Sequence, residues 1–441
     1  MSKKAYIETL GCQMNKSDSE KILGILENIG YQETKIPEEA DFLIINTCNI
    51  RAASEDKAFS YLGVWGKWKK TKPDLKIAVC GCVAQQAKEK IFKRAPYVNL
   101  IFGTHNIDEL PELLKSEKKV CSILKTHYKS DKQEFRIKRK SGISAWLPII
   151  EGCDYFCTYC VVPYTRGRQL SKKPEDIIKE AQEIINQGYK EITLLGQTVD
   201  SYGKDFKDEN INLSYILREL NNIENLVRIR FLTSHPADIT DDLIKTVKEL
   251  DKVCEYFHIP MQSGNTEILK KMKRNYTRED YIALIEKIRS HIPDVGITSD
   301  FIAGFSGETQ EQFEDTLLIV DEITFDHCNT AAYSQRKQTP AATWQDQIPR
   351  EIKKQRLNEL NEKVKHSVKK SNEKYLGKTL EVLVENFNKD ENNKIILNGR
   401  ARNNKIVHFS GDESLIGSLV SVEIQEAFIW CLKGTIFQYK N

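Results

Sequence analysis

The sequence lacks the features of a membrane or secreted protein. In its 441 residues, no apolar run approaches the roughly 18 residues that a membrane-spanning helix needs. The opening residues lead directly into a strand-like segment, without the apolar core and small-residue cleavage site of a secretory signal. With 40% hydrophobic and 29% charged residues, the composition is that of a globular protein. We therefore expect a cytoplasmic protein with no membrane partner.

The sequence also carries little net charge. Its 66 basic and 63 acidic residues give a net charge of +3, too close to neutral to indicate a nucleic-acid partner without local clustering. Clustering occurs twice. The segment from Lys115 to Lys140 holds ten Lys or Arg against three Asp or Glu, and the segment from Pro349 to Tyr375 is also rich in Lys and Arg. Either segment alone fits a solvated helix face or linker as well as an RNA-binding surface.

Eleven cysteines are present, and their odd number argues against a complete set of disulfides. In a reducing compartment disulfides are rare, so thiolate chemistry or metal binding is the leading interpretation.

The first hundred residues repeat a strand, a cysteine-containing turn and a helix three times. The predicted strands cover residues 5–10, 41–46 and 76–80, and the predicted helices cover 17–29, 53–65 and 84–94. Such alternation indicates a parallel sheet, whose ligands bind at the carboxyl ends of the strands. Cys12, Cys48 and Cys82 fall at those ends. Cys80 lies within the third strand, so we do not expect it to be a ligand.

A second series of strands and helices follows the basic segment. Its predicted strands cover residues 146–150, 191–196, 227–232, 254–260, 296–304 and 327–333. Pro174 begins a helix that Gly188 ends, and Thr309 with Gln312 forms a capping box before another helix. Six such units predict an open, partial (β/α)6 barrel, again with its chemistry on the loops at the carboxyl ends.

From about Gly377 the pattern changes to short alternating segments broken by Asn, Asp and Gly. They cover residues 379–386, 394–397, 404–409, 418–425 and 432–437. This pattern predicts a small five-stranded β-barrel. Such barrels often bind oligonucleotides, although many do not.

The most specific local motif is the segment from Glu151 to Cys160. Cys153, Cys157 and Cys160 place three thiols in one loop directly after the first central strand, at spacings that allow the loop to wrap an iron–sulfur cluster. A fourth cysteine is missing there, so a 4Fe–4S cluster would keep one iron open to a substrate or cofactor. A zinc site with a distant fourth ligand is an alternative, but this spacing is less usual for zinc. Buried free thiols are the other alternative, which a polar, aromatic loop disfavours.

This cysteine spacing resembles the signature of the radical S-adenosylmethionine enzymes, whose open iron binds the cofactor. The three amino-terminal cysteines, the continuation from Val161 to Gly167 and the terminal β-module together resemble the methylthiotransferases over essentially the whole chain. The resemblance implies a second, auxiliary 4Fe–4S cluster on Cys12, Cys48 and Cys82. It also implies that the terminal module is an RNA-binding TRAM domain.

Four further segments look closest to the MiaB branch of this family. They are 195–198, 233–236, 258–264 and 299–309, of which Thr233-Ser-His-Pro236 is the most telling. This branch adds a methylthio group to C2 of isopentenylated adenosine at position 37 of tRNA. The sequence departs from the family pattern at Ser306, where Pro is usual, and at residues 336–338, where Arg-Lys-Gln replaces Arg-Pro-Gly.

The resemblance also points to residues that could contact S-adenosylmethionine or the adenosine. Tyr159 lies inside the cluster loop, and four polar residues lie at strand ends: Gln197, Gln262, Ser263 and Asp300. An equal alternative for Tyr159 is that its ring only packs in the protein. An equal alternative for the four polar residues is that each forms a hydrogen bond that closes a turn. We expect His235 and His258 to be structural.

We therefore predict four segments: an amino-terminal methylthiotransferase domain at 1–120, a basic linker at 121–140, a radical S-adenosylmethionine partial barrel at 141–375 and a TRAM-like β-barrel at 376–441. The expected partners are tRNA and a low-potential reductant such as flavodoxin or ferredoxin, and the expected state is a monomer. The same chemistry on threonylcarbamoyl adenosine or on an aspartate of a ribosomal protein is the nearest alternative. A non-catalytic iron–sulfur RNA-binding protein is a more distant one, because two three-cysteine sites would each leave an open iron.

Overall fold

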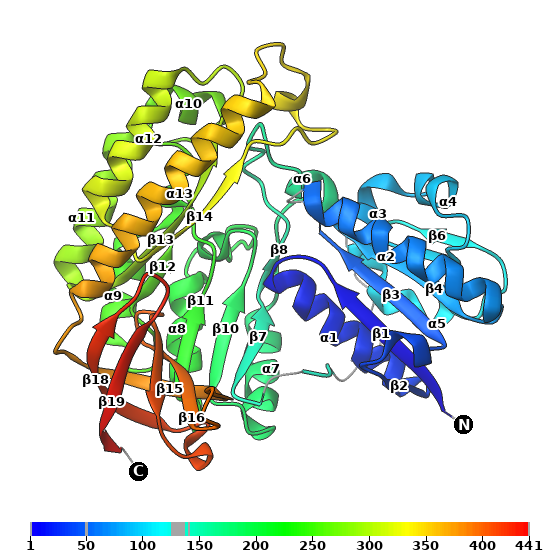
Figure 1. Cartoon of the computed structure of the whole chain (residues 1–441), viewed down its shortest axis with the longest axis horizontal. Coiled ribbons are helices and arrows are strands. Elements are labelled where there is room, and N and C mark those ends of the chain that lie inside the picture. Colours follow the sequence, from blue (N-terminus) through cyan, green and yellow to red (C-terminus); the bar gives the residue numbers. More distant parts are fainter. Residues whose placement is uncertain (1, 49–51, 125–136, 140–141, 440–441) are drawn as a thin grey trace.

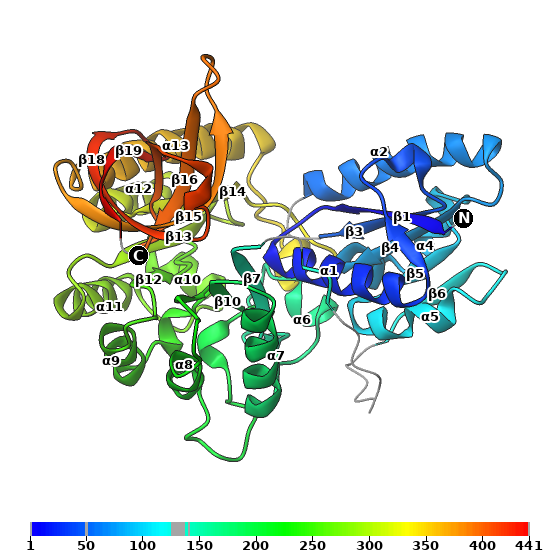
Figure 2. The same cartoon turned by 90° about the horizontal axis from the view of Figure 1, so that it is seen from below.

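The computed structural model describes residues 2–48, 52–124, 137–139 and 142–439. Much of the predicted basic linker, residues 125–136 and 140, lies outside the described residues. In Figure 1 the amino-terminal domain (blue to cyan) lies to the right of a central domain, and the terminal β-module (orange to red) packs against the lower end of the central domain; Figure 2 shows the same three parts from below. None of the helices in the described ranges is long and apolar enough to cross a membrane.

The amino-terminal domain is built on a six-stranded parallel sheet. Its strands, in the spatial order β2-β1-β3-β4-β5-β6, are β2 (Tyr31–Glu33), β1 (Lys3–Thr9), β3 (Phe42–Thr47), β4 (Lys76–Gly81), β5 (Leu100–Phe102) and β6 (Val120–Ser122). All six residues of β3 are buried, because helices cover both faces of the sheet. The sheet extends to Ser122, just past the predicted boundary at residue 120.

Successive residues of β3 pack against different helices. Phe42 and Ile44 share a core with α1 (Gln13–Asn28) and α5 (Leu110–Leu113). Leu43 and Ile45 share the opposite core with α2 (Ala52–Thr71) and α4 (Lys90–Arg94). The single helix predicted over 84–94 is wrong in one respect. Lys88 adopts a φ of 51°, which divides it into α3 (Cys82–Ala87) and α4.

The central domain confirms the predicted series of six parallel strands. They are β7 (Ser144–Pro148), β10 (Glu191–Leu195), β11 (Arg228–Phe231), β12 (Tyr256–His258), β13 (Gly296–Ala303) and β14 (His327–Ala332). They form two three-stranded sheets, β7-β10-β11 and β12-β13-β14, which meet at a single parallel bridge between Ile229 and Val253. In the part of the chain that the structure describes, no pairing joins β7 to β14. The barrel is therefore open on one side, as an incomplete (β/α)6 barrel should be.

Helices cover the outside of this partial barrel (Figure 1). They are α7 (Pro174–Asn186), α8 (Leu213–Asn221), α9 (Asp241–Glu249), α10 (Thr266–Lys271), α11 (Arg278–His291), α12 (Gln310–Ile323) and α13 (Arg350–Glu373). The predicted capping box is present, since Thr309 Oγ1 accepts from Gln312 N while Gln312 Oε1 accepts from Thr309 N. The basic segment predicted at 349–375 forms α13.

The terminal module is a closed five-stranded barrel, as predicted. Its strands are β15 (Thr379–Lys389), β16 (Ile395–Ala401), β17 (Ile406–Ser410), β18 (Leu419–Ala427) and β19 (Leu432–Tyr439), in the closed order β15-β16-β17-β19-β18. It has its own core, which includes Val382, Leu397 and Val422.

This module docks on the amino ends of the central strands. Arg228, which is fully buried, donates from Nη1 to Arg400 O at 2.6 Å. Arg230 Nη2 donates to Ala401 O at 2.8 Å. In return, Arg402 Nη2 donates to Val253 O at 2.6 Å. The approach is close, because a Cβ on Gly296 would lie 2.2 Å from the backbone oxygen of Asn403.

Candidate functional site

The three amino-terminal cysteines all lie at the carboxyl edge of the six-stranded sheet. Cys12 follows β1 and caps α1, Cys48 follows β3, and Cys82 begins α3 directly after β4. The loops that carry them pack tightly. A Cβ on Gly11 would lie 2.6 Å from the Cβ of Cys48, so only glycine fits beside that cysteine.

The thiols of Cys12, Cys48 and Cys82 act on one another. A hydrogen bond with Cys48 lowers the pKa of Cys12 to about 5, against the effect of burial. Burial raises the pKa of Cys82, and the charge on Cys12 raises it further. Cys80 differs, because it is 1% exposed, packs in the apolar core against α1, and has a pKa raised well above its usual range by burial.

A network of buried amides and hydroxyls supports the amino-terminal cysteine loops. Asn15 Nδ2 donates to Asn46 Oδ1 at 3.1 Å, and Asn46 Nδ2 donates to Asn15 O at 2.8 Å and to Ser19 Oγ at 3.0 Å. Asn15 Oδ1 lies 3.4 Å from the sulfur of Cys12. The loops after β1 and β3 are therefore fixed to each other by hydrogen bonds.

The second cysteine set lies in the loop between β8 (Ile150–Glu151) and α6 (Val162–Thr165). The loop closes on itself, since Cys153 N donates to Gly167 O at 3.2 Å and Cys160 N donates to Cys157 O at 2.9 Å. Gly152 begins it with a φ of 76°, and a Cβ there would lie 2.1 Å from Arg168 O. A side chain at Gly152 would displace the loop.

Polar side chains from other elements reach two of these sulfurs. Thr198 Oγ1 lies 3.6 Å from the sulfur of Cys153, and Arg274 Nη1 lies 3.8 Å from that of Cys157. Burial raises the pKa of Cys153, and burial together with the neighbouring Cys157 raises that of Cys160 to about 12. A bound metal would reverse this, because coordination removes the thiol proton.

Within the described ranges, no three His, Cys, Asp or Glu side chains converge closely enough to hold a single metal ion. A 4Fe–4S cluster binds its cysteines through separate irons, so its thiolates stand farther apart than the ligands of one ion.

The predicted cofactor-contact residues divide by how their side chains are used. Gln197 Oε1 accepts from Gly152 N at 2.6 Å, so this side chain holds the cluster loop. Ser263 is fully buried, and its Oγ accepts from Asn265 N at 3.3 Å, which closes a turn. Tyr159 packs edge-on against Phe305, with ring centroids 6.3 Å apart.

The other two predicted residues lie on or beside β13. Gln262 has a φ of 76° and pairs through its backbone with β13. Asp300 accepts from Asn329 Nδ2 at 2.9 Å and lies 3.4 Å from His258 Nε2. The Asp300 side chain is 35% exposed, so it can still reach a ligand.

The two histidines are held by the protein. His235 Nδ1 accepts from Ala237 N at 3.2 Å, and its ring stacks on Tyr155 with centroids 3.7 Å apart. Burial lowers the pKa of His235 to about 2, so the ring is neutral. His258 Nδ1 lies 2.9 Å from Thr298 Oγ1.

Four residues near the thiols, Thr198, Arg274, Arg166 and Arg336, are absent from the sequence-based expectations. Arg166 and Arg336 lie beside the amino-terminal cysteines, and their charges act on Cys82 and Cys48. Residue types and spacing do not mark the four residues as neighbours of the thiols, although Arg166 and Thr198 lie in segments, 161–167 and 195–198, that carry the family resemblance.

A cleft of about 640 Å³ opens where the three domains meet. The central strands contribute Trp146 and Thr298, and the β-module contributes Arg400 and Trp430. Lys16 of α1 completes it from the amino-terminal domain. The cleft combines aromatic rings with cations, a combination that suits a nucleic acid.

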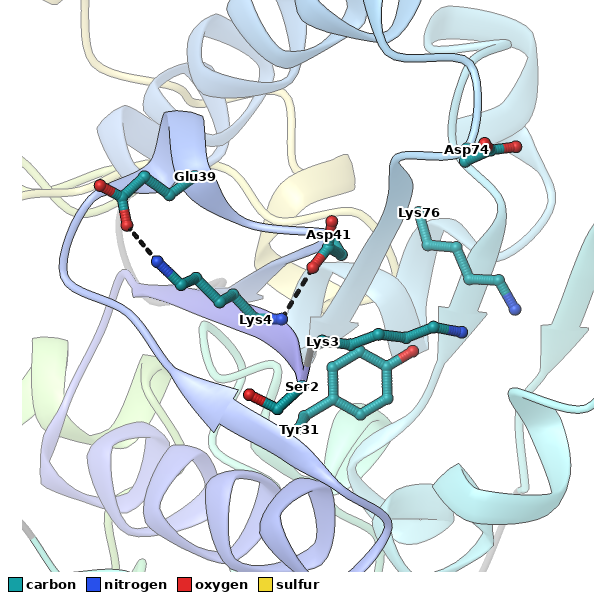
Figure 3. Close-up of a pocket in the computed structure, with 8 residues that line it drawn as sticks. All are labelled: Ser2, Lys3, Lys4, Tyr31, Glu39, Asp41, Asp74 and Lys76. Atoms are coloured by element: carbon teal, nitrogen blue, oxygen red, sulfur yellow. Dashed lines mark hydrogen bonds and ion pairs between the residues drawn. The ribbon is translucent and has the colours of Figure 1, made fainter.

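A second hollow lies at the amino ends of the strands in the amino-terminal sheet. It is lined by Ser2, Lys3, Lys4, Tyr31, Glu39, Asp41, Asp74 and Lys76 (Figure 3). There Lys4 bonds to Glu39 through its side chain and to Asp41 through its backbone nitrogen. These residues lie at the amino ends of β1, β3 and β4, away from the cysteines, so this hollow takes no part in the thiol chemistry.

Comparison with known proteins identifies each domain. Residues 4–103 match the family described as "Uncharacterized protein family UPF0004", residues 147–320 match the radical SAM superfamily, and residues 373–437 match the TRAM domain. A "tRNA-2-methylthio-N(6)-dimethylallyladenosine synthase" of Clostridium perfringens strain 13 is 48% identical over 445 residues, covering 99% of both chains. One of the same name from Acetivibrio thermocellus is 48% identical, covering 98% of this chain and 91% of that protein.

The chain belongs to this family of synthases. Solved structures agree on the fold. The radical S-adenosylmethionine methyltransferase TsrM from Kitasatospora setae, with cobalamin and a 4Fe–4S cluster bound, superposes with a TM-score of 0.55 at 13% identity, covering 78% of this chain and 77% of that one. The cobalamin-dependent enzyme OxsB gives a TM-score of 0.51 at 12% identity, covering 83% and 56%.

Proposed function

We propose that this protein transfers a methylthio group to C2 of isopentenylated adenosine at position 37 of tRNA. One observation carries the proposal: one three-cysteine site lies at the carboxyl edge of the amino-terminal sheet and another in the loop that follows β7 and β8, in a chain 48% identical to synthases of that name. One site alone would generate a radical. The second gives the reaction a place for sulfur.

Cys153, Cys157 and Cys160 would hold one 4Fe–4S cluster, and Cys12, Cys48 and Cys82 would hold the other. Their soft thiols, of which those of Cys48, Cys82 and Cys157 are buried, suit iron–sulfur clusters. When bound, the central cluster and S-adenosylmethionine together supply the 5'-deoxyadenosyl radical, and the auxiliary cluster supplies the site for sulfur.

The chain's own residues position these sites. Gln197 and Gly152 fix the entry to the central loop, and Arg274 and Thr198 contact its sulfurs. Asp300 can accept a hydrogen bond from S-adenosylmethionine or from the adenosine. Tyr159, Gln262 and Ser263 shape the wall of that site, since their side chains or backbones are already engaged in packing and turns.

The tRNA binds along the cleft between the three domains. Trp146 and Trp430 offer surfaces for stacking of bases, while Lys16 and Arg400 offer charge for phosphates. The open side of the partial barrel, between β7 and β14, admits an adenosine that is turned out of the anticodon loop. The three domains thus have separate tasks: residues 1–120 serve sulfur transfer, residues 141–375 radical chemistry and residues 376–441 RNA binding.

The remaining partners follow from this chemistry. A cytoplasmic flavodoxin or ferredoxin delivers the low-potential electron, and a single chain carries the whole site, so we propose a monomer. Both clusters and the RNA cleft are built from one chain.

The proposal is tested by measuring two products in one anaerobic assay with reductant, S-adenosylmethionine and isopentenylated tRNA. Wild type should form both 5'-deoxyadenosine and methylthiolated adenosine. Cys157→Ala should form neither. The triple variant of Cys12, Cys48 and Cys82 to Ala should still form 5'-deoxyadenosine but no methylthiolated product, because only the sulfur site is lost.

Cys254→Ala is the matched control, since Cys254 is a buried thiol far along the chain from both sets. It should behave as wild type. If the triple variant still makes methylthiolated tRNA, the auxiliary site does not carry the sulfur. If wild type acts only on threonylcarbamoylated tRNA or on a ribosomal protein, the proposed substrate is wrong while the chemistry stands.

A further inference from the structure

Arg166 connects the two cysteine sites. It follows Cys160 in the chain and lies at the end of α6, yet its side chain, 3% exposed, reaches into the amino-terminal domain. There Arg166 Nη2 donates to Asp18 Oδ2 at 2.6 Å. Asp18 lies on α1, the helix that Cys12 caps. Arg166 therefore belongs to the central domain by sequence, while its side chain contacts the amino-terminal domain.

The guanidinium of Arg166 is incompletely satisfied. Within the described part of the chain, its Nη1 is buried and has no hydrogen-bond partner. A buried N–H group that lacks an acceptor is costly and rare in native structures. Against the effect of burial, the charge of Arg166 and a side-chain hydrogen bond from it lower the pKa of the Cys82 thiol, and the charge also lowers the pKa of Cys12. The remaining donor, Nη1, therefore lies beside the site that these thiols form.

A second arginine of the central domain, Arg336, lies near Cys48. Arg336 lies in the loop after β14, is 8% exposed, and its charge acts on Cys48. Its loop is held against the amino-terminal domain, because Gln86 Nε2 donates to Lys337 O at 2.7 Å. Thr104 Oγ1 likewise donates to Thr165 O at 3.3 Å, beside Arg166. Both arginines are therefore held where the domains meet.

We propose that Arg166 is a positioning residue of the auxiliary cluster. Its Nη1 donates a hydrogen bond to a sulfur of the cluster that Cys12, Cys48 and Cys82 hold, and its fixed charge favours the more reduced, more negative state. The inference rests on the proposed function, because it requires an iron–sulfur cluster at these cysteines. The cysteine ligands thus come from one domain and the compensating charge from the other.

The test measures the reduction potential and the electron paramagnetic resonance spectrum of the auxiliary cluster alone. The background is the full-length chain with Cys153, Cys157 and Cys160 changed to Ala, reconstituted anaerobically. Arg166→Gln should shift the potential to more negative values and change the spectrum. Arg166→Lys, which keeps the charge but not the planar donors, should shift it less.

Arg168→Gln is the matched control. Arg168 lies two residues away, is 70% exposed and pairs with Asp154, so its removal should leave the potential of the auxiliary cluster unchanged. Because Arg166→Gln leaves Asp18 buried without its cation, the double variant Arg166→Gln, Asp18→Asn removes both charges and preserves folding. It should shift the potential in the same direction but by less, because the charge of Asp18, which opposes that of Arg166 at Cys82, is lost as well.

Two results separate this inference from the proposed function. If the background protein binds the auxiliary cluster but Arg166→Gln and the double variant keep its potential and spectrum, Arg166 serves only the ion pair with Asp18, and the inference is overturned. If the background protein binds no iron at Cys12, Cys48 and Cys82, the proposed function fails at its auxiliary site, and the inference fails with it.

Discussion

At the scale of single residues, Gln197 is the clearest case of a side chain that serves the cluster loop indirectly. Its Oε1 accepts from the backbone nitrogen of Gly152, where the chain takes a positive φ and passes close to Arg168 O. The loop begins at this hydrogen bond. Its loss would free the backbone just before Cys153.

We expect Gln197→Leu to weaken the central site. A buried backbone N–H without its acceptor costs about 1–3 kcal/mol, and this cost falls on the loop that holds the central thiols. The variant should release iron from the central site to a chelator faster than wild type does, with less 5'-deoxyadenosine formed.

Gln197→Glu keeps an acceptor oxygen and should retain most of the iron. Gln187→Leu, on the exposed end of α7, is the control for added apolar surface. Equal rates of iron release from Gln197→Leu and wild type would show that the loop is stable without this bond.

Residue types and spacing were enough to predict that Cys12, Cys48 and Cys82 lie at strand ends and that Cys80 lies within a strand, and the structure has them there, whereas their role as cluster ligands stays a prediction. They were not enough to find Arg166. Its partner Asp18 lies 148 residues earlier in the chain, and only the folded domains bring the two together. Ser263 shows the opposite error. Its position at a strand end predicts contact with a ligand, but its hydroxyl closes a turn instead.

At the scale of elements, α13 is tied to the loop before α12 by one buried ion pair. Arg356 Nη1 donates to Glu308 Oε2 at 2.9 Å, and Gly304 N donates to the same oxygen at 2.8 Å. Burial raises the pKa of Glu308 to about 7 despite these donors. The carboxyl therefore holds its proton more tightly in the folded protein than in the unfolded chain.

This raised pKa predicts how stability depends on pH. Between the ordinary pKa of 4.5 and about 7, the folded protein binds a proton at Glu308 that the unfolded chain has lost, so this contribution to stability falls as pH rises. The contribution is complete below pH 4.5 and lost above about 7, and it amounts to about 3 kcal/mol.

Glu308→Gln should remove this contribution, so the free energy of unfolding should decline less between pH 5 and 7 than in wild type. Urea unfolding at pH 5, 6 and 7 measures it, with the exposed Glu314→Gln as control. An unchanged decline in Glu308→Gln would mean that Arg356 keeps the carboxylate ionised throughout.

Most long elements were predictable because their apolar period is strong. The six central strands and five terminal strands lie where the alternation places them. The break between α3 and α4 was not predictable, since Lys88 takes its positive φ without a glycine to announce it. The strands β2, β5 and β6 are three residues each, too short for a period to show.

At the scale of the whole molecule, the cleft makes the three domains depend on one another for RNA binding. Trp430 of the β-module is 52% exposed and lies edge-on to His327 of β14, with ring centroids 5.6 Å apart. The contact with His327 holds the Trp430 ring in place, and about half of the residue stays exposed to solvent. That arrangement suits stacking of an unpaired base.

We expect Trp430→Ala to weaken binding of tRNA about tenfold, since one stacked base contributes about 1–3 kcal/mol. Fluorescence anisotropy with labelled tRNA at fixed salt measures the affinity, and iron content should stay at the wild-type value.

Phe437→Ala is the matched control, because Phe437 is an exposed aromatic of the same module, 69% exposed, that does not line the cleft. If Phe437→Ala weakens binding while Trp430→Ala does not, the RNA follows another face of the module.

The docking of the β-module could not be predicted from sequence. Arg228 and Arg230 lie in a strand pattern where charged residues usually indicate an exposed face, yet both are buried. Their acceptors, Arg400 O and Ala401 O, are backbone oxygens more than 170 residues later, and no side-chain pattern marks them.

This docking also orders events during synthesis. Ribosomes deliver the chain from its amino end, so β11 emerges long before β16, whose end supplies the acceptors for Arg228 and Arg230. Until then, the N–H groups of Arg228 and Arg230 that bind these acceptors, at the amino end of the central barrel, must be hydrated. The middle of the protein therefore reaches its final state only when its last segment has left the ribosome.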